Sequence, residues 1–209
     1  MIKNKKNPLI QICNLSHSFE GRLIFENLSF SISKWDICLI TGPSGVGKTT
    51  LLSLVWGIVP PQSGTVTYDP ILIPRERAIW YALIDGPFFE LLSARDNIYL
   101  LESFAGVRID TDYYRELIEY FEIRELVDMK MISLSAWQRE RVNFVRALIH
   151  RPRLLILDEP WANLDTHLFM KMISYIEQEV RDSDMACIIV SHDERFIPLS
   201  TEHIILTPR

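Results

Sequence analysis

A run of eight residues has the composition and spacing of a loop that binds phosphate. The run is Gly42-Pro43-Ser44-Gly45-Val46-Gly47-Lys48-Thr49, which matches the pattern G-x-x-x-x-G-K-[ST]. Glycines let the backbone turn so that successive N–H groups point at a phosphate, and the start of a following helix adds further donors. We expect Lys48 to reach the β- and γ-phosphates, Thr49 to hold Mg²⁺, and Thr50 to complete the nucleotide contacts. A glycine turn with a solvated lysine is the alternative, but the strand before the run and the helix after it favour the phosphate loop.

Two carboxylates follow an apolar strand predicted over residues 154–157. Asp158 can bind Mg²⁺ through water, and Glu159 is placed one residue further out, where a base could polarise an attacking water. Taken alone, the segment also fits a strand that ends in a solvated acidic turn. Beside a phosphate loop, the metal and base roles become the better interpretation.

A second anion site is predicted at Ser135 and Gln138. Their S-x-x-Q spacing is that of a capping box, so a helix should start there with free N–H groups and its positive dipole end facing an anion. An ordinary capped surface helix is the alternative.

The elements that must position these groups follow from the hydrophobic pattern. Strands are predicted over residues 9–13, 28–32, 36–40, 65–68 and 78–83, turns over 20–22 and 60–64, and a helix over 48–56. Helical periodicity dominates residues 92–149. The last third alternates again, with a strand at 154–157, a helix at about 168–180, a strand at 187–190, a short helix and a strand near Ile204. This order predicts an α/β fold with a largely parallel sheet and a helical insert.

Composition limits the function classes. The 209 residues are 48% hydrophobic and 23% charged, which is typical of one folded domain with a sizeable core. The formal net charge of −5 provides no basic field, so nucleic acid is not an expected partner. Three widely spaced cysteines, Cys13, Cys38 and Cys187, predict buried thiols in a reducing, cytosolic setting. The longest apolar stretch, residues 51–59, is shorter than the roughly 18–20 residues of a membrane span, so no span is expected.

Three further segments, together with the motifs above, carry a resemblance to a known family. The chain resembles the nucleotide-binding domain of ABC transporters over essentially its whole length. The segments are Leu134-Ser135-Ala136-Trp137-Gln138 at the family's signature, Ala162-Asn163-Leu164-Asp165 at its D-loop, and Ser191-His192-Asp193 at its switch histidine. Phe19 resembles the aromatic residue that stacks on adenine, although an aromatic beside strand residues often only packs in a core. A single histidine at a strand end is also usually structural, so the catalytic role of His192 depends on the other motifs.

The resemblance implies a phosphate-loop nucleotide hydrolase of the RecA-like type in one ABC ATPase domain. A mainly parallel core would occupy about residues 1–84 and 150–209, and a helical subdomain about 90–149. An antiparallel β subdomain would stand at the N-terminus.

The resemblance also implies a role. Such a chain would bind ATP and Mg²⁺, hydrolyse ATP with Lys48, Glu159 and His192, form a homodimer that sandwiches ATP head to tail, and pair with an integral membrane permease. The signature residues Ser135, Ala136, Trp137 and Gln138, and Asp165, would contact nucleotide. The chain would be peripheral, at the cytoplasmic face of the inner membrane of a bacterium. Its short single-domain format and residues 162–165 resemble lipoprotein-releasing and macrolide-exporter ATPases. The spacing from Asp85 to Leu92 resembles that of the small haem-exporter ATPase. Both likenesses imply export, of a lipoprotein, peptide or haem-like cargo.

Two motifs, the signature and the Q-loop, depart from the family pattern. Ala136 and Trp137 replace the signature glycines, and the bulky Trp137 would stand where backbone must approach phosphate unless it points toward the adjoining helix or a partner. The family's Q-loop glutamine falls at Asp85 or Ile84. Asp85 could approach Mg²⁺ as an oxygen ligand, although a carboxylate cannot donate a hydrogen bond as an amide does. These departures motivate an alternative function, a nucleotide-dependent scaffold or regulatory protein with slow turnover, beside the ATPase.

A dense apolar patch follows, Pro87-Phe88-Phe89-Glu90-Leu91-Leu92, in a segment expected to be a surface loop. Such patches mark partner sites, and in the family this region forms part of a groove for a helix of the membrane subunit. We expect Phe88 or Phe89 to contact a permease. Ordinary packing of the helical insert is the alternative.

Overall fold

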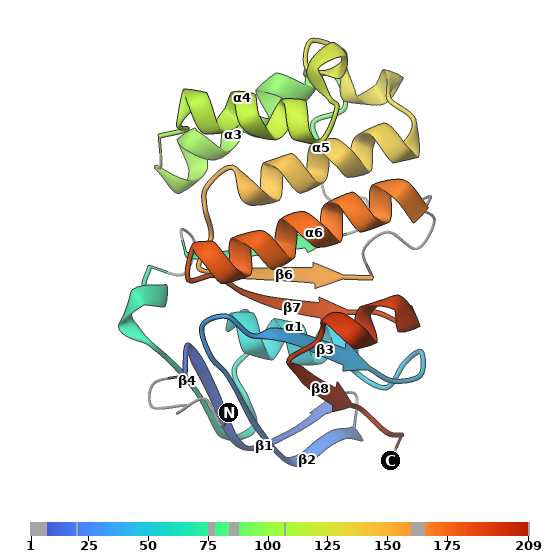
Figure 1. The fold of residues 1–209 in the computed structure, drawn as a ribbon. Coiled ribbons are helices and arrows are strands. Elements are labelled where there is room, and N and C mark those ends of the chain that lie inside the picture. The colour runs from blue at the N-terminus through green and yellow to red at the C-terminus, as the bar shows by residue number, and fades with distance from the viewer. Residues whose placement is uncertain are drawn as a thin grey trace.

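A five-stranded parallel sheet forms the centre of the molecule, in the strand order β5-β6-β7-β3-β8. The computed structural model describes residues 8–19, 21–74, 78–83, 88–106, 108–159 and 166–208. The strands of this sheet are β3 (Ile37–Thr41), β5 (Ile79–Leu83), β6 (Leu154–Asp158), β7 (Ala186–Val190) and β8 (Glu202–Ile205). Parallel strands end at the same edge, so the loops that follow β3, β6 and β7 start side by side (Figure 1).

Both faces of this sheet are covered, which explains its near-continuous apolar strands. Leu39 faces a core shared with α6 (Thr166–Asp182), whereas its neighbours Cys38 and Ile40 face a core shared with α1 (Lys48–Trp56). The predicted helix over 48–56 is confirmed with the same bounds, and the helix near 168–180 is longer than predicted.

A separate antiparallel sheet has the strand order β2-β1-β4. Its strands are β1 (Ile10–Phe19), β2 (Arg22–Ile32) and β4 (Ser63–Tyr68). This sheet packs on the α1 side of the parallel sheet, so the antiparallel N-terminal sheet is confirmed. Three bounds differ clearly from the prediction. β1 continues to Phe19 through register shifts that its alternation did not reveal. β2 begins at Arg22 and not at residue 28, and β4 begins at Ser63, so both start inside predicted turns.

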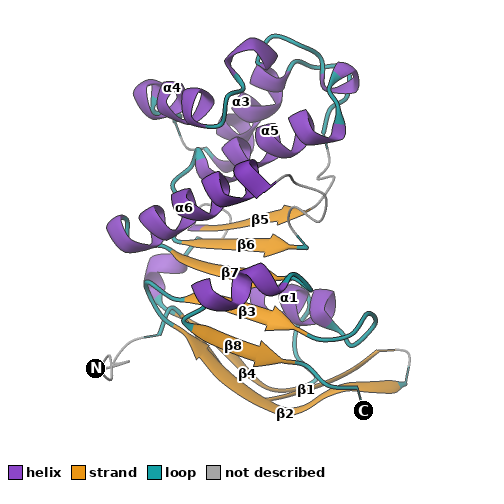
Figure 2. Ribbon diagram, turned by 45° about the vertical axis from the view of Figure 1, so that its right-hand side comes forward, coloured by secondary structure: helices purple, strands orange, loops and turns teal. Residues whose placement is uncertain are grey.

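The middle of the chain is helical, as predicted. It contains α3 (Ala94–Ala105), α4 (Thr111–Tyr120) and α5 (Ala136–Leu148). Figures 1 and 2 place these helices at one end of the molecule and the antiparallel sheet at the other. Four short 3₁₀ helices complete the description: η1 (Pro70–Leu72), η2 (Arg124–Leu126), η3 (Met131–Ser133) and η4 (Glu194–Leu199).

The cysteines agree in part with the prediction of buried thiols. Cys38 and Cys187 are buried thiols, and Cys13 is a thiol that is only partly buried. Burial raises the pKa of the Cys187 thiol, so it is inert as a nucleophile. Among the described residues, no helix has both the length and the apolar character needed to cross a membrane.

Candidate functional site

The phosphate loop runs from the end of β3 to the start of α1. Gly47 is the N-cap of α1, with a φ of 104°, and a Cβ there would collide with the side chain of Ile24. Gly42 has a φ of 151°, and its Cβ would come within 2.6 Å of the Leu206 carbonyl oxygen. Only glycine satisfies both the backbone and the space at these positions, which explains the spacing that predicted the loop.

Lys48 lies beneath this loop with its side chain only 10% exposed. Its ammonium donates to the carbonyl oxygens of Gly42 and Pro43, at 2.9 and 3.2 Å. It also lies 3.0 Å from His192 Nε2 and 3.9 Å from Glu159 Oε1. The positive charge is therefore fixed between the loop and the two residues predicted to handle water.

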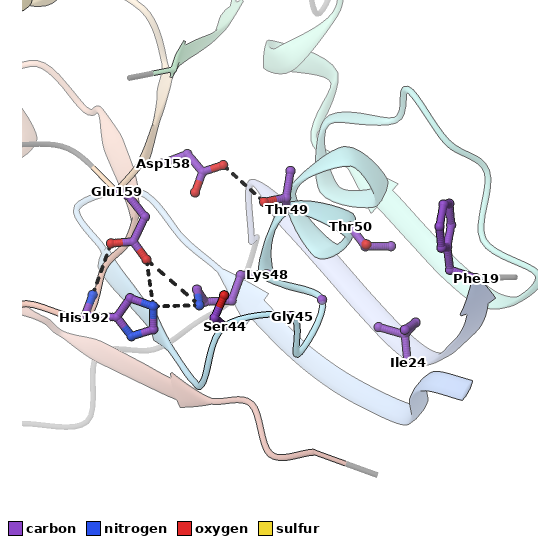
Figure 3. Close-up of a pocket in the computed structure, with 11 residues that line it drawn as sticks. Phe19, Ile24, Ser44, Gly45, Lys48, Thr49, Thr50, Asp158, Glu159 and His192 are labelled. Carbon is purple, nitrogen blue, oxygen red and sulfur yellow. Dashed lines mark hydrogen bonds and ion pairs between the residues drawn. The ribbon is translucent and has the colours of Figure 1, made fainter. Parts of the chain in front are cut away.

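Glu159 directly follows β6, and its backbone has a φ of 47°, which is uncommon for a residue with a side chain. A hydrogen bond of 2.7 Å from its N–H to the Val190 carbonyl holds this conformation. The carboxylate accepts the N–H of His192 at 3.3 Å and lies 3.1 Å from His192 Nε2 (Figure 3). Local backbone strain therefore brings a carboxylate, a histidine and a lysine together, as is common at active sites.

Asp158 and Thr49 meet on the other side of Lys48. The Thr49 hydroxyl donates to Asp158 Oδ2 at 3.5 Å, a long contact between groups that suit Mg²⁺. Among the described residues, no group of three His, Cys, Asp or Glu side chains could hold a metal alone. Mg²⁺ bound with nucleotide takes only one or two protein ligands beside phosphate oxygens and water, so Thr49 and Asp158 fit that ion. When bound, Mg²⁺ would neutralise charge that develops on the phosphates.

These groups line one cavity of about 370 Å³. Its lining residues are Phe19, Ile24, Ser44, Gly45, Gly47, Lys48, Thr49, Thr50, Asp158, Glu159 and His192. Figure 3 shows the carboxylates at one end and Phe19 and Ile24 at the other, with the loop between them. A volume in this range suits a ligand of nucleotide size.

Most predicted residues of the first site meet in this cavity, with some differences. Phe19 is 59% exposed on the cavity wall, so the alternative of a core residue is wrong. Gly42 and Pro43 do not line the cavity but bind Lys48, and Val46 is buried. Sequence reasoning missed Ile24, whose only signal is its place two residues after the turn that follows Phe19.

The signature segment lies outside the cavity, at the start of α5. Its capping box is confirmed, since the Ser135 N–H donates to Gln138 Oε1 at 2.9 Å and the Gln138 N–H donates to Ser135 Oγ at 3.3 Å. Trp137 is 39% exposed. Ser135, Ala136, Trp137 and Gln138 therefore present a helix start on the surface, where a second chain can reach it. The predictions for Asp85, Ile84 and Asp165 fall outside the described residues.

Comparison with known proteins agrees with this geometry. The family model described as ABC transporter matches residues 25–162. The lipopolysaccharide export system ATP-binding protein LptB of Escherichia coli K12 is 33% identical over 195 residues, which are 87% of this chain and 79% of LptB. The Fe(3+) ions import ATP-binding protein FbpC 2 of Haemophilus influenzae is 32% identical over 197 residues, 90% of this chain and 55% of that protein.

Solved structures share the fold. A dimeric ATP-binding cassette in a post-hydrolysis state, bound to ADP and Pi, matches with a TM-score of 0.82 at 21% identity over 94% of each chain. CbiO1 of Clostridium perfringens, part of the ABC transporter complex CbiONQ, matches with a TM-score of 0.80 at 22% identity, over 96% of this chain and 85% of CbiO1. The chain therefore belongs to the ABC transporter family, as an ATP-binding subunit that hydrolyses ATP with Mg²⁺.

Proposed function

We propose that Glu159 is the catalytic base of this ATPase and that the chain powers export. The observation that carries the catalytic proposal is the Glu159 carboxylate, which lies 3.1 Å from His192 Nε2 and 3.9 Å from the Lys48 ammonium. A carboxylate held this way can accept a proton from water, and the neighbouring cation stabilises the negative charge that the water gains.

The other side chains have separate tasks in this proposal. Lys48 and the N–H groups of residues 42–49 bind the phosphates, and Thr49 and Asp158 hold the metal. His192 donates to or accepts from the attacking water together with Glu159. Phe19, exposed on the cavity wall, offers its ring to the base of the nucleotide.

Glu159→Gln tests the base directly. The amide keeps the size of the side chain but cannot take a proton, so ATP binding should persist while turnover falls at least about 100-fold. Glu194→Gln is the matched control, because Glu194 is an exposed carboxylate on η4 outside the cavity. Retained turnover in Glu159→Gln would assign the base to another group.

Export is the finer part of the proposal, and the likeness to the lipopolysaccharide export protein supports it. The Fe(3+) import relative is almost equally similar, so sequence identity alone does not choose a direction. We infer that the cargo is a lipoprotein, peptide or haem-like molecule and that the chain works at the cytoplasmic face of the inner membrane. Affinity purification of the tagged chain from detergent-solubilised native membranes, with its partner identified by mass spectrometry, tests both inferences. A permease that belongs with a periplasmic binding protein would contradict export.

The partner should dock on the segment that begins at Phe88. Phe89 is 54% exposed and Leu91 72% exposed, whereas Phe88 packs against the core of the helical region. Of the two aromatics predicted to contact a permease, Phe89 is therefore the better contact. Phe89→Ser should remove the partner from the purification at unchanged thermal stability, whereas Ile197→Ser, at a 45% exposed residue on η4, should retain it. Retention in both variants would contradict the contact.

The scaffold alternative retains one supporting observation. Trp137 is exposed at the start of α5, where a bulky side chain hinders close approach of the backbone to a phosphate. A complex that assembles with ATP but hydrolyses less than about one ATP per minute would favour the scaffold function. The median turnover rate of enzymes is roughly 10 per second, so such a complex would be a very slow ATPase.

A further inference from the structure

Residues 88–91 alternate between two sides. Phe89 and Leu91 face outward, while Phe88 and Glu90 contact α5 through their side chains. Two hydrogen bonds between a buried side chain and the backbone of Phe89 fix the segment in this orientation. Asn97, which is 2% exposed, accepts from the Phe89 N–H at 2.8 Å and donates to its carbonyl at 3.1 Å.

The inward side is attached to α5 by an ion pair. Arg139 donates to both carboxylate oxygens of Glu90, at 2.7 and 2.5 Å, and to the Met131 carbonyl oxygen at 3.2 Å. The guanidinium holds the pKa of the Glu90 carboxyl below its usual range. Two parallel hydrogen bonds fix direction as well as distance, so this pair orients the two elements relative to each other.

A second attachment lies beside the first. The Phe88 ring contacts two guanidinium groups of α5, that of Arg146 at 4.3 Å and that of Arg139 at 5.3 Å from the ring centroid. Arg146 is only 8% exposed, and burial lowers its pKa to about 10. A buried cation against an aromatic face is a stronger contact than an exposed one, so Phe88 reinforces the ion pair.

Arg139 is the residue directly after Gln138 of the signature capping box. We propose that Glu90 and Arg139 are positioning residues that hold the exposed segment and the signature end of α5 as one rigid unit. A membrane partner on Phe89 and Leu91 then sets the direction in which Ser135 faces the nucleotide of a second chain. This inference rests on the proposed function for the docking of the partner on Phe89 and Leu91.

The test uses the complex purified through the tagged chain and measures its ATPase rate. Glu90→Ala should leave the partner bound and the KM for ATP unchanged, while kcat falls about fivefold or more, the size of a typical coupling effect. Glu90→Asp, which keeps the carboxylate, should restore most of the rate. Asp128→Ala is the matched control, since Asp128 pairs at 2.9 Å with Arg95 of α3 and not with an arginine of α5, and its kcat should not change.

Two results would overturn the proposal. One is an unchanged kcat in the Glu90→Ala complex. The other is loss of the partner from Glu90→Ala alone, which would make Glu90 a direct contact and not a positioning residue.

Failure of the proposed function gives a different result, because the wild-type chain would then bring down no membrane protein. In that case hydrogen exchange of the isolated chain tests the rigid unit. Glu90→Ala should accelerate exchange at residues 89–92 and 136–139 together. Acceleration at 89–92 alone would overturn the proposal.

Discussion

Trp137 is the most pronounced departure of this chain from the signature that it resembles, because the signature has a glycine at this position. It is the second residue of α5 and is 39% exposed. Helical side chains generally lean toward the N-terminus, so we expect the indole to lie over the helix end that we assign to the nucleotide of a second chain. Its bulk therefore separates the free N–H groups of that end from a phosphate.

Replacing Trp137 by glycine should raise turnover. The N–H groups can then approach the phosphate, and we expect kcat to rise about tenfold, equivalent to roughly 1.4 kcal/mol of barrier. The same substitution at Trp35, which is 43% exposed in the turn before β3, should leave kcat unchanged. A lower kcat in Trp137→Gly would show instead that the indole makes a productive contact.

Glycines of the phosphate loop differ in the space around them. Both Gly45 and Gly47 have positive φ, 76° and 104°, but a Cβ at Gly45 meets nothing within 4 Å, whereas one at Gly47 meets Ile24 and Phe25. Gly45→Ala should therefore cost only the backbone strain of about 1–2 kcal/mol. Gly47→Ala should cost about 1–3 kcal/mol more, because two packed side chains must also move. Urea unfolding of both variants measures the difference, and equal costs would contradict the argument.

At the scale of elements, local signals predicted the helix starts well. The capping box at Ser135 and Gln138 was readable because both partners lie within one turn. The strand before Gly42 was readable because four of its five residues, Ile37 to Ile40, are apolar. The alternation at residues 88–91 was not readable. Phe88 and Phe89 are the same residue type, and only the packing of Arg139 and Arg146 decides which of them faces inward.

One partly buried histidine, whose ring nitrogens are buried, makes the stability of the fold sensitive to pH. His150, after the end of α5, lies 5.8 Å from Trp80 of β5, and neither of its ring nitrogens has a hydrogen-bond partner in the described part of the chain. Burial lowers its pKa, although Glu102 acts in the opposite direction. As pH falls below about 6.5, the unfolded chain takes up a proton that the folded chain resists, so stability must decrease.

His150→Phe should remove this contribution. Between about pH 7.5 and pH 5.5, the urea midpoint of the wild-type chain should fall more than that of His150→Phe, because the variant has no proton to take up there. His167→Phe, at an exposed position of α6, is the control and should behave like the wild type. Equal falls in wild type and His150→Phe would show that other groups cause the acid sensitivity.

At the scale of the whole molecule, strand order is what the sequence could not reveal. All eight predicted strands are present. However, β3 lies between β7 and β8, which are far from it in the chain. Parallel pairing joins residues of large sequence separation, such as Leu39 with Ile189, and no local pattern encodes the choice of partner. That pairing nevertheless builds the site, because it brings the loops after β3, β6 and β7 to one edge.

Ser135 does not line the cavity that Lys48 and Glu159 share, so we expect a second chain to complete the site. If the signature of one chain completes the cavity of another, two different inactive chains can restore a site between them. Lys48→Ala destroys the phosphate loop and keeps the signature, and Ser135→Arg does the reverse. In a coexpressed mixture half the pairs are mixed and each has one good site of two, so the ATPase rate should return to about a quarter of the wild type. Mixing Lys48→Ala with Glu159→Gln should restore nothing, because both changes damage the same side of the site. Equal activity in the two mixtures would place the whole site within one chain.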